Sequence, residues 1–150
     1  MSAAMRRLIP LLVFLAACGT HSGQRPANVA KPDIDVSQAS PIFFNSRNNS
    51  PLSLAVRIRN NATMPLRVRE VEVRASGMMQ YSLQRRVKLF NETIPPNDER
   101  VLYVETTAYQ NSNTRIQGSE PLAVQTLVRF EVEGRGFREI LLHEVVGPGT

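Results

Sequence analysis

The sequence predicts an all-β fold, a single antiparallel β-sandwich of roughly seven or eight strands. Two observations lead to this prediction. From residue 41 onward, apolar and polar side chains alternate with a period of two, which is typical of strands with one face in a core and one in water. Clusters of Gly, Pro, Asn and Asp separate the alternating runs, as turns do. No segment of about 12 residues carries the apolar stripe of a helix.

Two runs show the alternation most clearly, one over Leu52–Arg59 and a longer one over Leu122–Val132. Six further strands are predicted at Ile42–Asn45, Leu66–Arg74, Met79–Leu83, Val87–Phe90, Val101–Thr106 and Phe137–Val145. Turns are predicted at Asn60-Asn61, Ser76-Gly77, Pro95–Asp98 and Glu133–Gly136. The last of these joins two strong strands and predicts a hairpin.

Short strands at this spacing favour a sandwich of immunoglobulin-like type. The chain lacks Trp and has a single Cys, so it is not a true antibody-type domain. The segments Asn60–Leu66 and Ile94–Pro96, each at a strand boundary, resemble those of small bacterial immunoglobulin-like and LEA14-type domains. This resemblance implies the same β-sandwich fold.

The parity of the apolar residues changes within one predicted strand. Leu66 and Val68 share one parity, whereas Val71 and Val73 share the other. A β-bulge near Arg69-Glu70 would return the later residues to the core face. The alternative is a strand that changes sheets at this point.

The N-terminus has the pattern of a secretory signal peptide. Arg6-Arg7 precedes the apolar run Leu8–Ala17, and Cys18 follows at once. The run is shorter than the roughly 20 residues that a transmembrane helix needs. Met5 is an alternative start, because the residues before it add nothing to the pattern.

Leu15-Ala16-Ala17-Cys18 resembles the lipobox of bacterial lipoproteins. The resemblance implies cleavage between Ala17 and Cys18, a diacylglycerol on the Cys18 thiol and acylation of the new amino group, such as palmitate. In these families Asp after the cysteine retains the protein at the inner membrane. Gly19 therefore implies an outer-membrane lipoprotein, and we expect its domain to face the periplasm. The alternative for Cys18 is a free thiol after an ordinary signal-peptidase site.

The predicted organisation has three parts: a signal peptide over residues 1–17, the lipidated Cys18 with a flexible tether over residues 18–39, and a β-sandwich domain over residues 40–150. Small, polar and Pro residues dominate the tether, which we expect to let the domain stand tens of ångströms from the membrane. His21 lies in this segment without a second residue at metal-ligand spacing. We interpret it as solvated.

Composition narrows the function classes. A single Cys excludes an internal disulfide framework and a Cys-rich zinc site. Loss of Arg6 and Arg7 with the signal peptide lowers the formal net charge from +5 to +3. The arginines are not clustered with aromatic residues that would stack on bases, and export separates the chain from the genome. We expect no nucleic-acid partner.

Four arginines are the candidate binding site. If Leu52–Arg59 and Leu66–Arg74 pair as a hairpin, Ile58 lies opposite Val68, and the arginines gather on the outward face. They are Arg57, Arg59, Arg67 and Arg69. Such a patch suits phosphate or carboxylate groups. The alternative is a solvated face neutralised by Glu70, Glu72 or a glutamate on an adjacent strand.

The sequence predicts no enzyme, no cofactor and no metal site. His143 lies in an alternating strand, and the glutamates Glu131, Glu133 and Glu139 belong to the outward side of strands or to a turn. No Gly-rich phosphate loop or nucleophile elbow is present. The segment Thr107–Pro121 is long for a sandwich connection and is either a recognition loop or a plain crossover between sheets.

These observations predict a lipid-anchored envelope protein, a non-catalytic interaction or scaffold module with an envelope protein as partner. The alternative is a periplasmic carrier or binding protein for an envelope lipid, glycan or other anionic ligand.

Overall fold

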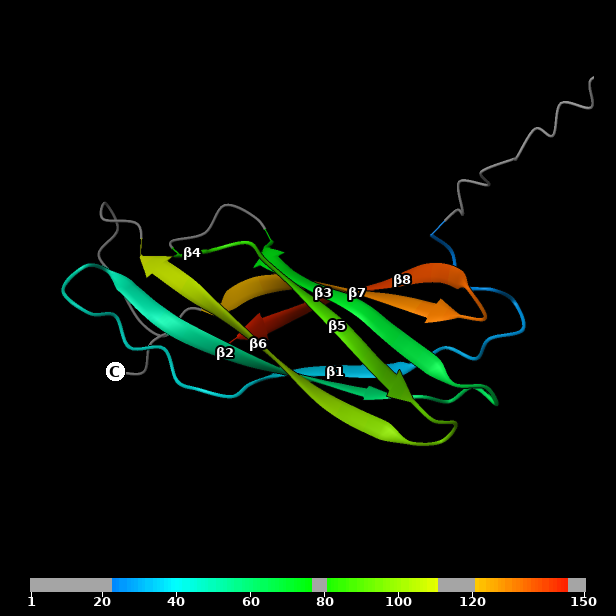
Figure 1. Cartoon of the computed structure of the whole chain (residues 1–150). Coiled ribbons are helices and arrows are strands. Elements are labelled where there is room, and N and C mark those ends of the chain that lie inside the picture. The colour runs from blue at the N-terminus through cyan, green and yellow to red at the C-terminus, as the bar shows by residue number, and fades with distance from the viewer. Residues whose placement is uncertain (1–22, 77–80, 111–120, 146–150) are drawn as a thin grey trace, which may run out of the picture.

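The computed structural model describes residues 23–76, 81–110 and 121–145. Within these ranges the strands are β1 (Asp33–Gln38), β2 (Asn49–Arg59), β3 (Leu66–Ala75), β4 (Tyr81–Leu83), β5 (Arg86–Ile94), β6 (Glu99–Gln110), β7 (Leu122–Val132) and β8 (Arg135–Val145). They form two antiparallel sheets packed face to face (Figure 1), sheet A with the order β1-β2-β6-β4 and sheet B with the order β5-β3-β7-β8. The predicted all-β sandwich is confirmed.

The core lies between the two sheets, and the period-two alternation of each strand supplies it. In β2 and β7, every second side chain is buried and the intervening ones face outward. The largest fully buried side chains are Val29, Leu52, Leu54, Val56, Ile58, Leu66, Val68, Val71, Val73, Ile94, Leu122 and Phe130. Phe130 stacks on Phe137 with ring centroids 5.1 Å apart. Each buried side chain of this size stabilises the fold by about 1.5–3 kcal/mol.

The predicted pairing of β2 with β3 is wrong. β2 lies between β1 and β6 in sheet A, whereas β3 lies between β5 and β7 in sheet B. Residues 60–65 therefore carry the chain from one sheet to the other instead of forming a hairpin turn. The return crossing, from β5 in sheet B to β6 in sheet A, is made by residues 95–98 at the same end of the sandwich.

Asn60 holds these two crossings together. Its side chain is buried, and its Nδ2 donates to the carbonyl oxygens of Met64 at 2.9 Å, Ile94 at 2.9 Å and Pro95 at 3.2 Å. Its Oδ1 accepts from the backbone N–H of Ala62 at 2.9 Å. The amide thus uses both its donor group and its acceptor, so that backbone groups at the end of the sandwich are satisfied without water.

The predicted bulge in β3 is confirmed. The register of β3 shifts between Val68 and Glu70 against both of its neighbours. Against β7, Arg69 is the extra residue, because Val68 pairs with Phe130 and Glu70 with the adjacent Arg129. Against β5, two residues, Phe90 and Asn91, lie opposite Arg69. Because of this insertion, Val68 and Val71 are both buried despite their opposite parity. β3 stays in sheet B along its whole length, so the alternative of a strand that changes sheets is wrong.

The predicted hairpin between β7 and β8 is also confirmed. Glu133 and Gly134 form a two-residue turn, with φ of 49° and 75°. Positive φ at both positions is the mark of a type I′ turn, whose twist matches that of the flanking strands. The turn fixes the register of the hairpin, which sets Arg129 opposite Arg138.

The segment predicted as a tether is largely part of the folded domain, which corrects the boundary at residue 39. β1 pairs with β2 along Asp33–Gln38, and the side chain of Val29 is buried in the core. The chain is already bound at Gly23, whose carbonyl oxygen accepts from the Arg138 N–H at 3.2 Å. Composition suggested a flexible linker, but pairing along the β2 edge and burial of Val29 order it.

Ile42–Asn45 is not a strand, which corrects another prediction. Ile42 is buried, but its backbone belongs to neither sheet, and the chain turns between Asn45 and Asn49. The predicted Met79–Leu83 corresponds to the short β4, and residues 77–80 lie outside the described chain. β7 has the predicted bounds, and the remaining strands are longer than predicted.

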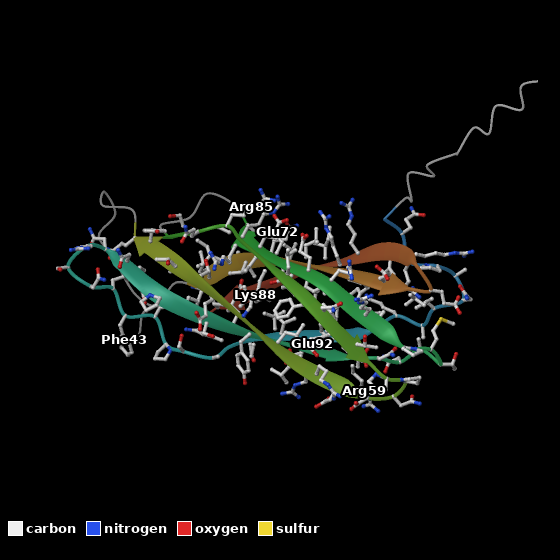
Figure 2. All side chains as sticks on the ribbon, in the orientation of Figure 1. Phe43, Arg59, Glu72, Arg85, Lys88 and Glu92 are labelled. Carbon is white, nitrogen blue, oxygen red and sulfur yellow. The ribbon has the colours of Figure 1, made fainter. Side chains whose placement is uncertain are left out.

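The edge strand β5 carries charged side chains on its core side. Lys88 pairs with Val71, and Glu92 pairs with Val68, both of which are core residues. Figure 2 shows Lys88 and Glu92 along this strand; the Lys88 Nζ donates to the Tyr103 carbonyl oxygen at 2.8 Å. Inward-pointing charges on an edge oppose the addition of a further strand. A partner is therefore expected at a sheet face rather than along β5.

Replacing Asn60 with Ala is expected to lower the free energy of unfolding by about 3 kcal/mol, because buried carbonyl groups of both crossings lose their donor. Asn61→Ala is the matched control. The exposed Asn61 makes a single side-chain hydrogen bond within the described chain, to Lys31, and its loss should cost about 0.5 kcal/mol. Urea denaturation followed by circular dichroism measures both. Equal effects of the two variants would contradict the role given to Asn60.

Candidate functional site

The four arginines predicted to share one face lie on two. Arg57 and Arg59 are on the outer face of sheet A, and Arg67 and Arg69 are on the outer face of sheet B. The prediction depended on a β2–β3 hairpin, which the crossing at Asn60 replaces. A single patch of these four side chains is therefore wrong.

Aspartates flank the arginines of sheet A. Arg57 is paired in register with Asp35 of β1, and Arg59 lies between Asp33 of β1 and Glu99 of β6. Opposite charges on neighbouring strands attract each other. This arrangement agrees with the alternative of a solvated face whose arginines are neutralised by neighbouring carboxylates. The carboxylates are mainly the aspartates of β1, not the predicted Glu70 and Glu72.

The arginines of sheet B form a larger group than the sequence predicted. The β7–β8 hairpin adds Arg129 and Arg138, directly opposite each other on the same face. We call Arg67, Arg69, Arg129 and Arg138 the arginine cluster. The sequence predicted this turn over Glu133–Gly136, which left the register open; the two-residue turn at Glu133-Gly134 fixes which residues face each other.

Two glutamates lie within the arginine cluster. Glu131 is 3.8 Å from Arg67 and 3.5 Å from Arg69, and Glu70 is 3.3 Å from Arg129. Within the described chain, Arg138 has no carboxylate within 4.0 Å. Long, partly exposed pairs of this kind contribute about 0–1 kcal/mol each. Their guanidinium groups are therefore free to exchange a carboxylate for an external anion at little cost.

Shallow hollows lie on both sides of Arg69. One, of about 440 Å³, is lined by residues that include Gly23, Arg69, Arg129 and Arg138. The other, of about 470 Å³, is lined by Arg67, Arg69 and Arg129 together with residues of β5. The bulge places Arg69 between them. Both hollows are open surface depressions with guanidinium groups in their walls, a form that suits an extended anionic surface.

Glu72 and Arg85 form a further ion pair on the same outer face (Figure 2). The Glu72 side chain is only 8% exposed, and the Arg85 Nε donates to its Oε1 at 2.7 Å. The Arg85 guanidinium lowers the pKa of Glu72 below its usual value of 4.5, although burial acts in the opposite direction. Glu72 lies in one row across the sheet with Val87 and Leu127.

Aliphatic side chains stand exposed around that row. Leu89 of β5 is 76% exposed, Leu142 of β8 is 70% exposed, and Val87 and Ile140 are also exposed. We call Val87, Leu89, Ile140 and Leu142 the aliphatic strip. The register places all four on the outer face of sheet B, with Val87 and Leu89 on the edge strand β5 and Ile140 and Leu142 on the opposite edge strand β8. The same face thus combines basic and apolar groups.

The two outer faces of the sandwich differ in charge. The described outer face of sheet B, including Arg85, carries Arg67, Arg69, Arg74, Arg85, Arg129 and Arg138 against Glu70, Glu72, Glu131 and Glu144. The outer face of sheet A carries Arg57 and Arg59 against Asp33, Asp35, Glu99 and Glu105. Sheet B is therefore basic and sheet A acidic.

His143 faces the interior side of β8. Neither of its ring nitrogens has a hydrogen-bond partner within the described chain. Burial lowers its pKa below the usual 6.5, although Asp35 acts in the opposite direction. The imidazole is therefore neutral at pH 7. A histidine in a half-buried strand is expected to be exposed or hydrogen-bonded, but the ring nitrogens of His143 are buried and have no nucleophile or carboxylate partner in the described chain.

Several predicted features lie outside the described chain: Ala17, Cys18 and His21, and residues 111–120 of the predicted 107–121 loop. Residues 107–110 belong to β6. Among the described residues, no group of three or more His, Cys, Asp or Glu side chains is placed to hold a metal ion. None of them forms a helix long and apolar enough to cross a bilayer.

No protein-family model and no curated protein sequence matches the chain. Among solved structures, it is similar to a Northeast Structural Genomics Consortium target, with a TM-score of 0.51 and 13% identity over 79% of this chain and 86% of that one. It is also similar to a late embryogenesis abundant (LEA) protein, with a TM-score of 0.45 and 11% identity over 81% of this chain and 74% of that one. The comparison with the PapD-like domain of human CEP192 gives a TM-score of 0.40 and 6% identity over 100% of this chain and 99% of that one. The likeness is one of fold alone, a weak structural resemblance to LEA14-like and PapD-like β domains.

The Glu72–Arg85 pair is expected to make stability depend on pH. A carboxyl group with a lowered pKa in the folded state stabilises the fold above its unfolded pKa, near 4.5, and this contribution is lost as pH falls through the lowered value. Glu72→Gln should therefore reduce the melting temperature at pH 7, and the difference should shrink below about pH 4. Glu144→Gln on the same face is the control and should leave the profile unchanged. If the melting temperature of Glu72→Gln is still lower than that of the native chain at pH 2.5, the ionised pair is excluded as the cause of the difference.

Proposed function

We propose that the chain is a lipoprotein of a bacterial cell envelope whose β-sandwich is a non-catalytic interaction module. The observation that carries the proposal is the order of the N-terminal features: Arg6-Arg7, the apolar run Leu8–Ala17 and the lipobox-like Leu15–Cys18. In this proposal Cys18 carries the diacylglycerol and is the mature N-terminus. Gly19 favours the outer membrane, with the domain in the periplasm.

The energetics of acyl anchoring support a permanent membrane protein. Each buried methylene contributes about 0.8 kcal/mol, and a single acyl chain binds a membrane only marginally. The modification implied at Cys18 supplies three chains, two in the diacylglycerol and one on the amino group. This number is sufficient for anchoring without a transmembrane helix.

The packing of the core favours an interaction module over a carrier with an interior site. Side chains of both sheets fill the space between them, from Leu52 and Leu54 on one side to Val128 and Phe130 on the other. A ligand would have to displace these side chains or bind to the outside. The exposed residues of the outer faces therefore carry the proposed function.

The outer face of sheet A offers a surface for a protein partner. Tyr103 of β6 is 54% exposed and lies in register with Ala55 of β2, which in turn pairs with Ser37 of β1. The small neighbours leave the ring standing above the sheet, and Val101 is exposed beside it. Exposed aromatic side chains are enriched at protein interfaces. We assign the envelope protein partner to this face.

Cys18→Ala is expected to abolish incorporation of radioactive palmitate and to release the chain from membranes. Ser22→Ala is the matched control and should be labelled and sediment with membranes like the native chain. Labelling in growing cells and flotation of membranes on a sucrose gradient measure the two properties. A Cys18→Ala chain that stays in the membrane fraction at the mass of the mature lipoprotein would exclude the anchor.

A photo-reactive phenylalanine analogue at Tyr103 is expected to cross-link to a protein in intact cells. The same analogue at Thr93, which is exposed on sheet B, is the control and should give weaker adducts. Adducts that disappear on protease treatment support the interaction module. Recovery of lipid or glycan with the purified chain, and no protein adduct, would instead favour the carrier for an anionic envelope ligand.

A further inference from the structure

The described chain begins next to the arginine cluster. Gly23 lies at the free edge of sheet B, where its carbonyl oxygen accepts from the Arg138 N–H, and it lines the same hollow as Arg69 and Arg129. In Figure 1 the blue start of the described chain lies beside the end of β8 that leads from the hairpin. Whatever holds the N-terminus therefore acts at this edge of sheet B.

The reach from Cys18 to Gly23 is short. The two residues are five positions apart, and an extended chain spans at most about 17 Å over that distance. β8 alone, with 11 residues, is about twice that length. Because the segment after Gly23 is bound to the domain, the stand-off of tens of ångströms expected for a long tether does not apply. An anchor on Cys18 holds the arginine cluster close to the bilayer surface.

The face beside this anchor has the composition of a surface that binds an anionic membrane. The arginine cluster carries four guanidinium groups against two carboxylates, and guanidinium is well suited to phosphate. The aliphatic strip lies on the same face, with Leu89 and Leu142 more than two-thirds exposed. Attraction to anionic lipids and burial of apolar groups are the two contributions that hold a protein at a bilayer surface.

We propose that the outer face of sheet B rests on the anionic phospholipid headgroups of the membrane that carries the Cys18 anchor. The proposal depends on the lipidation proposed above. Arg69 and Arg138 contact lipid phosphates, and Leu89 and Leu142 enter the headgroup region. The acidic outer face of sheet A then points away from the membrane and is left free for a protein partner.

The single cysteine makes the orientation measurable on the full lipidated chain. The thioether at Cys18 uses its thiol, so a cysteine introduced elsewhere is the only reactive one. A fluorescent nitrobenzoxadiazole group is attached at Leu142→Cys on sheet B or at Tyr103→Cys on sheet A, both exposed positions. The labelled protein is reconstituted in vesicles of phosphatidylglycerol and phosphatidylethanolamine that contain headgroup-nitroxide lipids. We expect quenching several-fold stronger at position 142 than at position 103.

Charge reversal tests the arginine cluster directly. Each basic residue near an anionic bilayer changes the ratio of docked to undocked domains about fivefold. The double variant Arg69→Glu with Arg138→Glu should therefore lower this ratio by a factor of about 25 or more. The signal at position 142 should then fall to that at position 103. Arg57→Glu with Arg59→Glu makes the same change in charge on sheet A and should leave the quenching unchanged. Circular dichroism verifies that each variant is folded.

Flotation of the labelled protein separates the two proposals. A chain that does not float with the vesicles lacks the anchor, and this result would contradict both the lipidation at Cys18 and the proposed orientation. A chain that floats but shows equal quenching at positions 142 and 103 keeps its anchor and overturns the orientation alone. Quenching at position 142 that survives the Arg69 and Arg138 reversals also overturns it. Photo-crosslinking of a protein at position 142 in cells would assign the face to a protein partner instead.

Discussion

The side-chain amide of Asn60 is the interaction on which the sandwich depends. It joins the crossing from β2 to β3 with the return from β5 to β6, through the carbonyl oxygens of Met64, Ile94 and Pro95. Two backbone hydrogen bonds join the same crossings, from the Asn60 N–H to the Asp98 carbonyl oxygen and from the Asn97 N–H to the Asn60 carbonyl oxygen, and the side-chain amide satisfies further buried carbonyl groups of both. By sending β3 into sheet B, the crossing also decides which side chains share a face. The separation of Arg57 and Arg59 from Arg67 and Arg69 follows from it.

Two departures from regular strand geometry then assemble the arginine cluster. The bulge at Arg69 keeps Val68 and Val71 in the core and leaves Arg69 between two hollows on the outside. The type I′ turn at Glu133-Gly134 sets Arg129 opposite Arg138. Core burial and turn geometry fix both features for reasons of stability. The positions of Arg69, Arg129 and Arg138 thus follow from the bulge and the turn.

The two outer faces divide the proposed function between them. Sheet B joins arginines with exposed aliphatic residues next to the point where the N-terminal segment leaves the domain, whereas sheet A is acidic and carries the exposed Tyr103. The inward charges of Lys88 and Glu92 discourage strand addition along β5. A membrane on one face and a protein on the other is the arrangement that these surfaces support. In this arrangement the domain is an adaptor held flat on the bilayer.

The sequence by itself determined the fold class and the β7–β8 hairpin, because alternation and turn residues are local properties of the chain. The parity change in β3 limited the possibilities to a bulge near Arg69-Glu70 or a change of sheet, and the structure decided for the bulge. It also carries the whole argument for Cys18. Only the tertiary structure decided which strands are neighbours. It pairs β2 with β1 and β6 rather than with β3, and it buries Val29 of the predicted tether in the core. Pairing is non-local, because it joins residues far apart in the sequence and local alternation does not say which strands are neighbours. The sequence therefore did not predict that Arg129 and Arg138 join Arg67 and Arg69 on one face.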